Sequence, residues 1–292
     1  MKIAHRGWMQ TPLGHPDNGF TKALRKVCDT LIETNDITTI DSCDLLFLQP
    51  HDYGINIGQL ARLKAAGAVI LHWIGDARDT TPQYCYDYAP FVTVTCFSNM
   101  RDVRNMQAAG WDAAYLQIGA DPEIYFPNYQ TPKHIDIVFM GNNHASFPLS
   151  DYRMEMVHEL KRTYGERFKS YGHGMHDGYI SNQHEEAEVY RRSKIGINLS
   201  HYDYERYTSD RMMRMLCSGV CVLSHRYTAM EEEFNGEVVV WDSLDELKNQ
   251  IDSLLANEVK RQEIATAGYL LALKDFTFDA MVRNIMKIYN ER

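Results

Sequence analysis

Short apolar runs alternate with amphipathic helical patterns along the first part of the chain. Residues 2–5, 45–49, 69–73, 91–97 and 114–118 are typical of buried strands, and helical periodicity begins near residues 18, 57 and 99. Buried strands separated by helices indicate βαβ units, in which a parallel sheet carries helices on both faces. The pattern therefore predicts a Rossmann-like α/β domain in the first half.

The same rhythm restarts after a segment dense in proline and turn residues, 119–134. Strands are predicted over 135–140, 167–171, 195–200, 220–224 and 237–241, with helices beginning near residues 152, 186, 209, 229 and 243. Apolar residues from 278 to 289 recur at helical spacing and predict a terminal amphipathic helix. We therefore predict two Rossmann-like domains, an N-terminal one over 1–130 and a C-terminal one over 131–292.

Composition narrows the functional classes. The chain has 292 residues and a formal charge of -9, which argues against a surface dedicated to nucleic acid or anionic lipid. The N-terminal residues lack a secretory pattern, no stretch is long and apolar enough to span a bilayer, and the six cysteines show no zinc spacing. We expect a cytoplasmic protein with no membrane insertion and no metal site.

Ligands of open α/β sheets bind at the carboxyl ends of the strands, so the residues that follow each strand are the first candidates. Gly141 and Asn142 follow the first strand of the second domain, where glycine lets backbone N–H groups approach a phosphate, although a plain turn would look the same. Tyr171 and Gly172 end the next strand, where the ring would stack on a nucleobase or simply mark a tight turn.

The segment that follows residue 200 is the most informative. Ser209, Asp210 and Arg211 open a predicted helix and offer a hydroxyl, free N–H groups and a guanidinium, the combination that a pyrophosphate needs. The alternative is a capped helix in which Arg211 pairs with Asp203 or Glu205.

One carboxylate follows a strand of the first domain. Asp76 is placed to take a proton from an acceptor hydroxyl as a general base, or else it is a loop residue that pairs with Arg78. Further acceptor-side candidates lie near the same edge of the predicted sheet: His5, Asp17, His51 and Trp73.

Residues 209–219, SDRMMRMLCSG, resemble the S-x-R-x-F-E-x-L-A-x-G stretch of group-1 GT-B glycosyltransferases, particularly the spore-maturation CgeB-like branch. The similarity covers roughly residues 115–292, including IVFMGNN, YGHG and the interdomain segment GADPEIYFP. It implies two Rossmann-like domains facing a central cleft, with the C-terminal helix packing back toward the N-terminal domain. Arg214 stands where that family places a Glu that binds the ribose, so we keep it as a donor-binding candidate that would reach phosphate instead.

The resemblance implies metal-independent transfer of a sugar from a nucleotide-sugar co-substrate to a hydroxyl of a saccharide, coat or envelope component, with no cofactor, in a bacterial or phage-infected cell. Two alternatives stay open: a phage-type DNA glycosyltransferase acting on hydroxymethylated bases, and a non-catalytic nucleotide-sugar-binding homologue. A nicotinamide oxidoreductase would need G-x-G-x-x-G after its first strand, which this sequence lacks.

Overall fold

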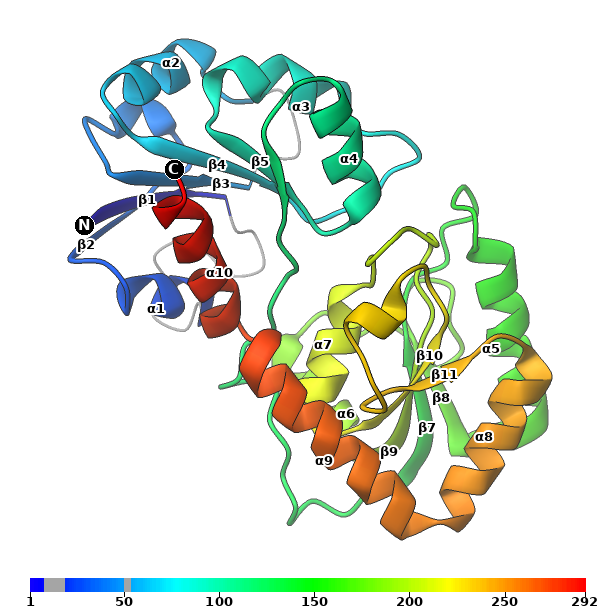
Figure 1. Ribbon diagram of the computed structural model, residues 1–292. Coiled ribbons are helices and arrows are strands. Elements are labelled where there is room, and N and C mark those ends of the chain that lie inside the picture. The colour runs from blue at the N-terminus through cyan, green and yellow to red at the C-terminus, as the bar shows by residue number, and fades with distance from the viewer. Residues whose placement is uncertain (8–18, 50–53) are drawn as a thin grey trace. The chain divides into compact units, whose positions relative to one another are not determined.

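The computed structural model describes residues 1–7, 19–49 and 54–292, which form two compact units (Figure 1). Unit 1 contains Met1–Ile118 and Phe278–Arg292, and unit 2 contains Gly119–Thr277. The candidates Asp17 and His51 lie outside the described residues.

Unit 1 is built on a parallel sheet of six strands in the order β2-β1-β3-β4-β5-β6. The strands are β1 (Lys2–Arg6), β2 (Thr30–Glu33), β3 (Leu45–Leu48), β4 (Val69–Ile74), β5 (Val94–Phe97) and β6 (Ala113–Tyr115). The helices are α1 (Gly19–Arg25), α2 (Ile57–Ala65), α3 (Gln83–Tyr88), α4 (Met100–Ala108) and α10 (Phe278–Asn290).

Helices cover both faces of this sheet, because side chains along each strand alternate between the two faces. Helices α1 and α10 pack on one face, where Phe20 and Met281 share a buried cluster with Phe47. Helix α2 covers the other face through Leu60 and its neighbours. Each face of the parallel sheet is therefore buried, as expected for strands that read as continuous apolar runs.

Unit 2 is built on a parallel sheet of five strands in the order β11-β10-β9-β7-β8. The strands are β7 (Ile135–Met140), β8 (Phe168–Tyr171), β9 (Ser193–Asn198), β10 (Cys221–His225) and β11 (Val239–Trp241). The helices are α5 (Ser150–Tyr164), α6 (Gln183–Arg191), α7 (Asp210–Cys217), α8 (Leu244–Ala256) and α9 (Glu258–Asp275).

Two buried clusters lie on opposite faces of the second sheet. Val138 of β7 packs with helices α6 and α7, whereas its neighbour Phe139 packs with helices α5 and α8. Figure 1 shows the same layers, with α6, α7 and α9 on one side of the strands and α5 and α8 on the other. The prediction of two parallel α/β sheets is confirmed.

The division between the units differs from the predicted boundary at residue 130. Unit 2 begins at Gly119 and ends at Thr277, and its first segment belongs there because Tyr125 is buried in the cluster that contains Tyr190 and Met212. Helix α10 belongs to unit 1, since its apolar face packs on α1 and the first sheet. Its grouping agrees with the expectation that the terminal helix packs toward the N-terminal domain.

The capping residues predicted for helices of the second half are confirmed at two positions, but one predicted helix is not formed. Gly219 ends α7 with a φ of +68°, and the Ser243 side chain caps α8 by accepting from the N–H of Glu246, as their sequence positions indicate. The prediction of a helix near residue 229 is wrong. The chain forms only a three-residue 3-10 turn, η4 (Met230–Glu232), which follows Ala229 in the left-handed backbone conformation.

Candidate functional site

The amino end of helix α7 is open to a ligand. Ser209 is the N-cap residue, but its side chain does not accept from the first turn; its hydroxyl donates weakly to Oδ1 of Asn198 over 3.4 Å. Its own N–H donates to the hydroxyl of Ser200. The N–H groups of Asp210 and Arg211 have no acceptor within the described chain, so they offer hydrogen bonds to an anion.

Two loops at the carboxyl ends of β7 and β8 are joined to each other. The N–H of Gly141 donates to the carbonyl of Tyr171 (2.9 Å), and the N–H of His173 donates to Oδ1 of Asn142 (3.0 Å). Gly172 has a φ of +139°, and a Cβ there would lie 2.0 Å from the carbonyl oxygen of Gly141. Glycine is therefore required at residue 172, because only its absent side chain allows the two loops to touch.

Arg153, which the sequence did not single out, lies beneath these loops. It is fully buried on α5 and donates to three groups, namely the carbonyls of Asn142 (3.0 Å) and Leu199 (2.5 Å) and Nε2 of His201 (2.6 Å). Its Nε has no acceptor, and no carboxylate among the described residues pairs with it. A buried cation without a counter-ion is costly, so the site favours an incoming anion.

Arg211 adds a second positive charge to this edge. Its half-buried side chain lies close enough to Arg153 and His201 for its charge to lower the pKa of both groups, in addition to the larger effect of burial. No carboxylate within the described chain pairs with Arg211, and Asp203 instead accepts from the N–H and hydroxyl of Thr228. The alternative of an ion pair from Arg211 to Asp203 or Glu205 is therefore not observed.

His201 is held neutral. Because guanidinium only donates, Nε2 of His201 must accept from Arg153, and its proton lies on Nδ1, which faces the hydroxyl of Ser150 (3.2 Å). The Ser150 hydroxyl in turn donates to the carbonyl of His144. Burial, with the charges of Arg153 and Arg211, lowers the pKa of His201 to about 3. The imidazole thus adds no positive charge and orients the guanidinium.

The structure gives Arg214 a different place from the one expected. Its guanidinium pairs with Asp210 (2.5 Å) and Glu186 (3.0 Å) and lies over the ring of Tyr125. Although burial alone lowers the pKa of Arg214, the two carboxylates outweigh it and raise that pKa. Arg214 therefore joins α6, α7 and the segment before β7, and its role in donor binding stays a prediction.

The Tyr171 ring is half-buried and packs against the apolar cluster of helices α6 and α7. Burial raises the pKa of its hydroxyl. More exposed rings follow on the same loop, where His173 and Tyr179 stack with centroids 4.2 Å apart. Tyr171 thus packs its ring partly against the core, and its role in stacking on a nucleobase stays a prediction.

In unit 1, the candidate base Asp76 follows β4 on a loop held by its neighbours. Its side chain is 58% exposed, and its carboxylate lies 3.4 Å from the guanidinium of Arg78. The hydroxyl of Ser98 donates to the carbonyl of Gly75, and Arg101 donates to the carbonyls of the loop at Arg78 and Asp79. Asp76 thus lies on the exposed surface of unit 1 beside Arg78, and its role as a base stays a prediction.

Two acceptor-side candidates are core residues instead. His5 is fully buried on the central strand β1, where Nε2 bonds with Oε1 of Gln49 (2.9 Å) and the ring contacts Phe20. Trp73 is 4% exposed and donates from Nε1 to the carbonyl of Leu116. Both side chains point from central strands into packed layers, so neither reaches an acceptor from this position.

The part of the chain that the structure describes contains no group of three or more His, Cys, Asp or Glu side chains arranged to hold a metal ion. Across the same residues, no helix combines the length and the apolar character needed to cross a membrane.

Comparison with known proteins gives a family-model match over part of the chain, and a fold. Residues 153–287 match the sequence model of a family described as "Glycosyl transferase-like". The matched range contains Arg153, Arg211 and the whole of α7. Curated protein sequences give no significant match.

Several solved structures share the architecture at low sequence identity. A glycosyltransferase from Rickettsia africae ESF-5 superposes with a TM-score of 0.65 at 12% identity, covering 99% of this chain and 98% of that one. Anabaena Alr3699/HepE, solved with UDP and glucose, gives 0.62 at 11% identity, with 100% of both chains covered. TarM, known from S. aureus, gives 0.61 at 11% identity; 84% of this chain is covered, but it spans only 54% of TarM.

The strand orders, the helical layers and these superpositions agree with one another. The chain therefore has the GT-B fold, and its residues 153–287 match a family model described as "Glycosyl transferase-like".

Proposed function

We propose that this protein transfers a sugar from a nucleotide-sugar donor to a hydroxyl acceptor, and that unit 2 holds the donor at the carboxyl edge of its sheet. The observation that carries the proposal is the pair of guanidinium groups, Arg153 and Arg211, that have no carboxylate partner beside an uncapped helix α7. A nucleoside diphosphate supplies the missing negative charge.

The chemistry of the leaving group fits this arrangement. As the bond between sugar and diphosphate breaks, negative charge grows on the diphosphate oxygens. Arg211 and the free N–H groups at Asp210 and Arg211 stabilise that charge directly, and the buried charge of Arg153 adds a fixed positive potential. These groups supply the charge neutralisation, so we propose that transfer needs no divalent cation.

The loops provide the remaining donor contacts in this proposal. Gly141 and Gly172 bring backbone close to the ligand, Asn142 fixes the two loops against each other, and Ser209 opens the helix. Asp76 of unit 1 is proposed as the general base that takes the acceptor's proton. Placement in the CgeB-like branch rests on the segment over residues 209–219.

The solved relatives support a uridine nucleotide as the donor base. Anabaena Alr3699/HepE binds UDP and glucose in its crystal structure, and it is covered over its whole length by this chain. We propose a UDP-linked hexose as the first donor to test, and a saccharide, coat or envelope component as the acceptor.

The experiment is a thermal-shift titration with UDP and UDP-glucose, followed by measurement of UDP release with and without EDTA. A ligand that binds only the folded state raises the melting temperature in a concentration-dependent way. We expect a saturable shift and EDTA-insensitive UDP release. No shift with UDP-, GDP-, ADP- or TDP-linked donors would contradict donor binding, and loss of release in EDTA would contradict only the metal-independent step.

A further inference from the structure

The loop that carries Asp76 is bonded to the neighbouring segment of unit 1. It spans residues 75–81 after β4, and residues 98–105 follow β5, the next strand of the sheet. Side chains of the second segment donate to three carbonyl groups of the loop, over 2.7, 2.7 and 2.9 Å, namely those of Gly75, Arg78 and Asp79. Because these carbonyls lie on both sides of Asp76, the backbone around that residue is fixed at both ends.

Arg101 supplies two of these bonds and is itself held in place. Its Nη2 donates to the carbonyl of Arg78 and to Oδ1 of Asp102 (2.8 Å), and its Nε donates to the same carboxylate oxygen (3.1 Å). Its Nη1 donates to the carbonyl of Asp79. A guanidinium is planar and its N–H groups have fixed directions, so the carboxylate sets the plane and the plane sets the two carbonyls.

Asp102 is the centre of this network. It is 1% exposed in the first turn of α4, and besides Arg101 its carboxylate accepts from the hydroxyl of Thr81 (2.6 Å) and from Nδ2 of Asn99 (2.9 Å). The Thr81 hydroxyl accepts in turn from Nδ2 of Asn105 (2.9 Å). The last residue of the loop is therefore bonded to a buried carboxylate as well.

Trp73 supports the loop from the strand that precedes it. A Cβ at Gly75 would lie 2.2 Å from Cη2 of the Trp73 ring, and Nε1 of that ring donates to the carbonyl of Leu116 (2.8 Å). A side chain at residue 75 would have to displace either this anchored indole or the loop. Trp73, predicted as an acceptor-side residue, thus packs against the loop that carries Asp76.

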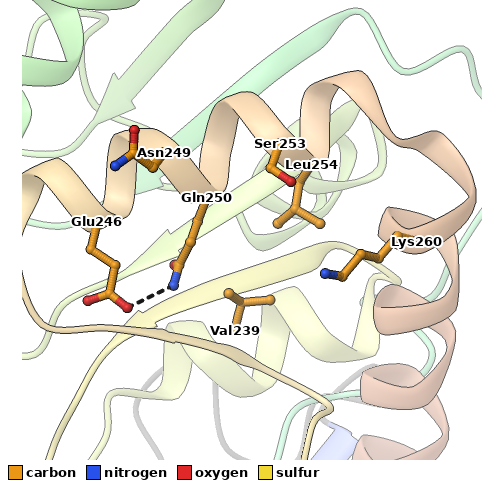
Figure 2. Close-up of a pocket in the computed structure, with 7 residues that line it drawn as sticks. All are labelled: Val239, Glu246, Asn249, Gln250, Ser253, Leu254 and Lys260. Carbon is orange, nitrogen blue, oxygen red and sulfur yellow. Dashed lines mark hydrogen bonds between the residues drawn. The ribbon is translucent and has the colours of Figure 1, made fainter.

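A hollow in unit 2 is a contrasting case. It has a volume of about 480 Å³ and lies beside α8, as Figure 2 shows. Three of its polar lining residues are exposed, Asn249, Ser253 and Lys260, and Glu246 brings a charge opposite to that of Lys260. Such a surface favours no single class of ligand, whereas the loop that carries Asp76 is held by buried groups.

We infer that Arg101, Asp102 and Thr81 are positioning residues for Asp76, and this inference rests on the proposed role of Asp76 as the general base. The Asp76 side chain is 58% exposed, so the loop backbone, rather than packing of the side chain, has to set its place. A buried ion pair adds little net stability, because desolvation offsets its attraction. The network therefore acts mainly on geometry, and a misplacement of about 1 Å costs up to about 100-fold in rate.

Hydrolysis of UDP-glucose by the full chain, followed as UDP release with water in place of the acceptor, tests this inference. Arg101→Lys keeps a positive charge beside Asp102 but loses the planar fork that reaches both carbonyls. We expect kcat to fall about 10-fold, while the KM for UDP-glucose and the affinity for UDP stay unchanged. The matched control is Lys64→Met, since Lys64 donates to the carbonyls of Pro90 and Val92 in the same unit; it should lower only the melting temperature.

A second pair of variants leaves every charge in place. Thr81→Val removes the hydroxyl with little change of shape, and kcat should fall about 5-fold, whereas Thr81→Ser keeps the hydroxyl and should retain the wild-type kcat. When it is added to Asp76→Asn, Arg101→Lys should cause no further loss, because the positioned group can no longer take a proton.

The outcomes separate this inference from the proposed reaction. Unchanged kcat in both Arg101→Lys and Thr81→Val would overturn the inference and leave transfer standing. An undiminished loss from Arg101→Lys in the Asp76→Asn background would do the same, since the network would then act on another group. Full activity in Asp76→Asn would contradict the base and this inference but not transfer, and a wild type that releases no UDP would contradict all three.

Discussion

Nη1 of Arg153 donates to Nε2 of His201 over 2.6 Å in the second unit. This bond fixes the protonation of both partners, because the guanidinium has no lone pair to give and the imidazole must therefore accept. The positive charge of Arg153 is thus oriented by a neutral group rather than cancelled by a carboxylate. Its charge remains available to act on whatever binds above the loops.

The neutral state of His201 makes stability depend on pH. Its pKa in the folded protein is about 3, below the ordinary value of about 6.5 for histidine in an unfolded chain. Below about pH 6.5 the unfolded state therefore takes up a proton that the folded state does not, and the free energy of unfolding falls as pH drops toward 3. His201 should contribute a loss of roughly 1–2 kcal/mol between about pH 7.5 and about pH 5.

Urea unfolding of the wild type and His201→Gln at both pH values measures this term, because glutamine still accepts from Arg153 but does not titrate. The variant should lose less stability on acidification than the wild type. His134→Gln, a change at an exposed histidine, serves as the matched control. Equal pH dependence in all three proteins would show that His201 titrates alike in the folded and unfolded states, so its pKa is not lowered by folding.

Arg211→Gln should weaken the binding of UDP about 10- to 100-fold, because a charge-assisted hydrogen bond to phosphate contributes about 1.5–3 kcal/mol. Arg162→Ala, on the exposed surface of α5, removes a charge from the same unit and should leave affinity unchanged. Calorimetric titration with UDP gives both affinities. An unchanged affinity in Arg211→Gln would remove this residue from the donor site.

Arg214→Met should act on folding. It leaves the half-buried carboxylates of Asp210 and Glu186 without their cation, and breaking a buried pair from one side costs about 3–5 kcal/mol. Denaturant unfolding should show this loss, and the double variant Arg214→Met with Glu186→Gln should recover part of it. A stable Arg214→Met protein that fails to bind UDP would instead indicate a direct donor contact.

Asp76→Asn should lower turnover about 10²- to 10⁴-fold with UDP affinity retained, since the amide keeps the shape of the side chain but cannot take a proton. Asp79→Asn, on the same loop, is the control. UDP release and UDP titration separate the two effects. Full activity in Asp76→Asn would exclude it as the base.

The hydrophobic periodicity of the sequence predicted most strands and helices of both units. It missed elements in which apolar and polar side chains do not lie on separate faces. Strand β2 is an edge strand without a fully buried residue, so it lacks the apolar run of its neighbours. Helix α9 was missed because large apolar side chains also lie on its exposed side, as at Val259 and Leu270. Such sequence patterns have no distinct apolar face, so tertiary packing determines which secondary structure the segment forms.

The sequence pointed to the loops and the helix start that form the proposed donor edge, but it missed Arg153, which lies among them. Arg153 shares a helix face with Met156, Val157 and Leu160, and this spacing alone would have indicated a buried arginine. Conversely, the polar type of His5 suggested a surface role, although its strand is central and covered on both faces. Residue chemistry suggests what a side chain can do, whereas the position of its strand decides whether it can reach a ligand.

The grouping of α10 with unit 1 also sets an order for synthesis. Unit 2 is one continuous stretch, complete in itself at residue 277, so it can fold as soon as that stretch leaves the ribosome. The first sheet must wait, because the apolar face around Phe20 and Phe47 gains its last covering helix only after residue 278 is made. The sheet of unit 1 is thus completed after unit 2. During synthesis, the apolar surface around Phe20 and Phe47 stays partly exposed until helix α10 has been made.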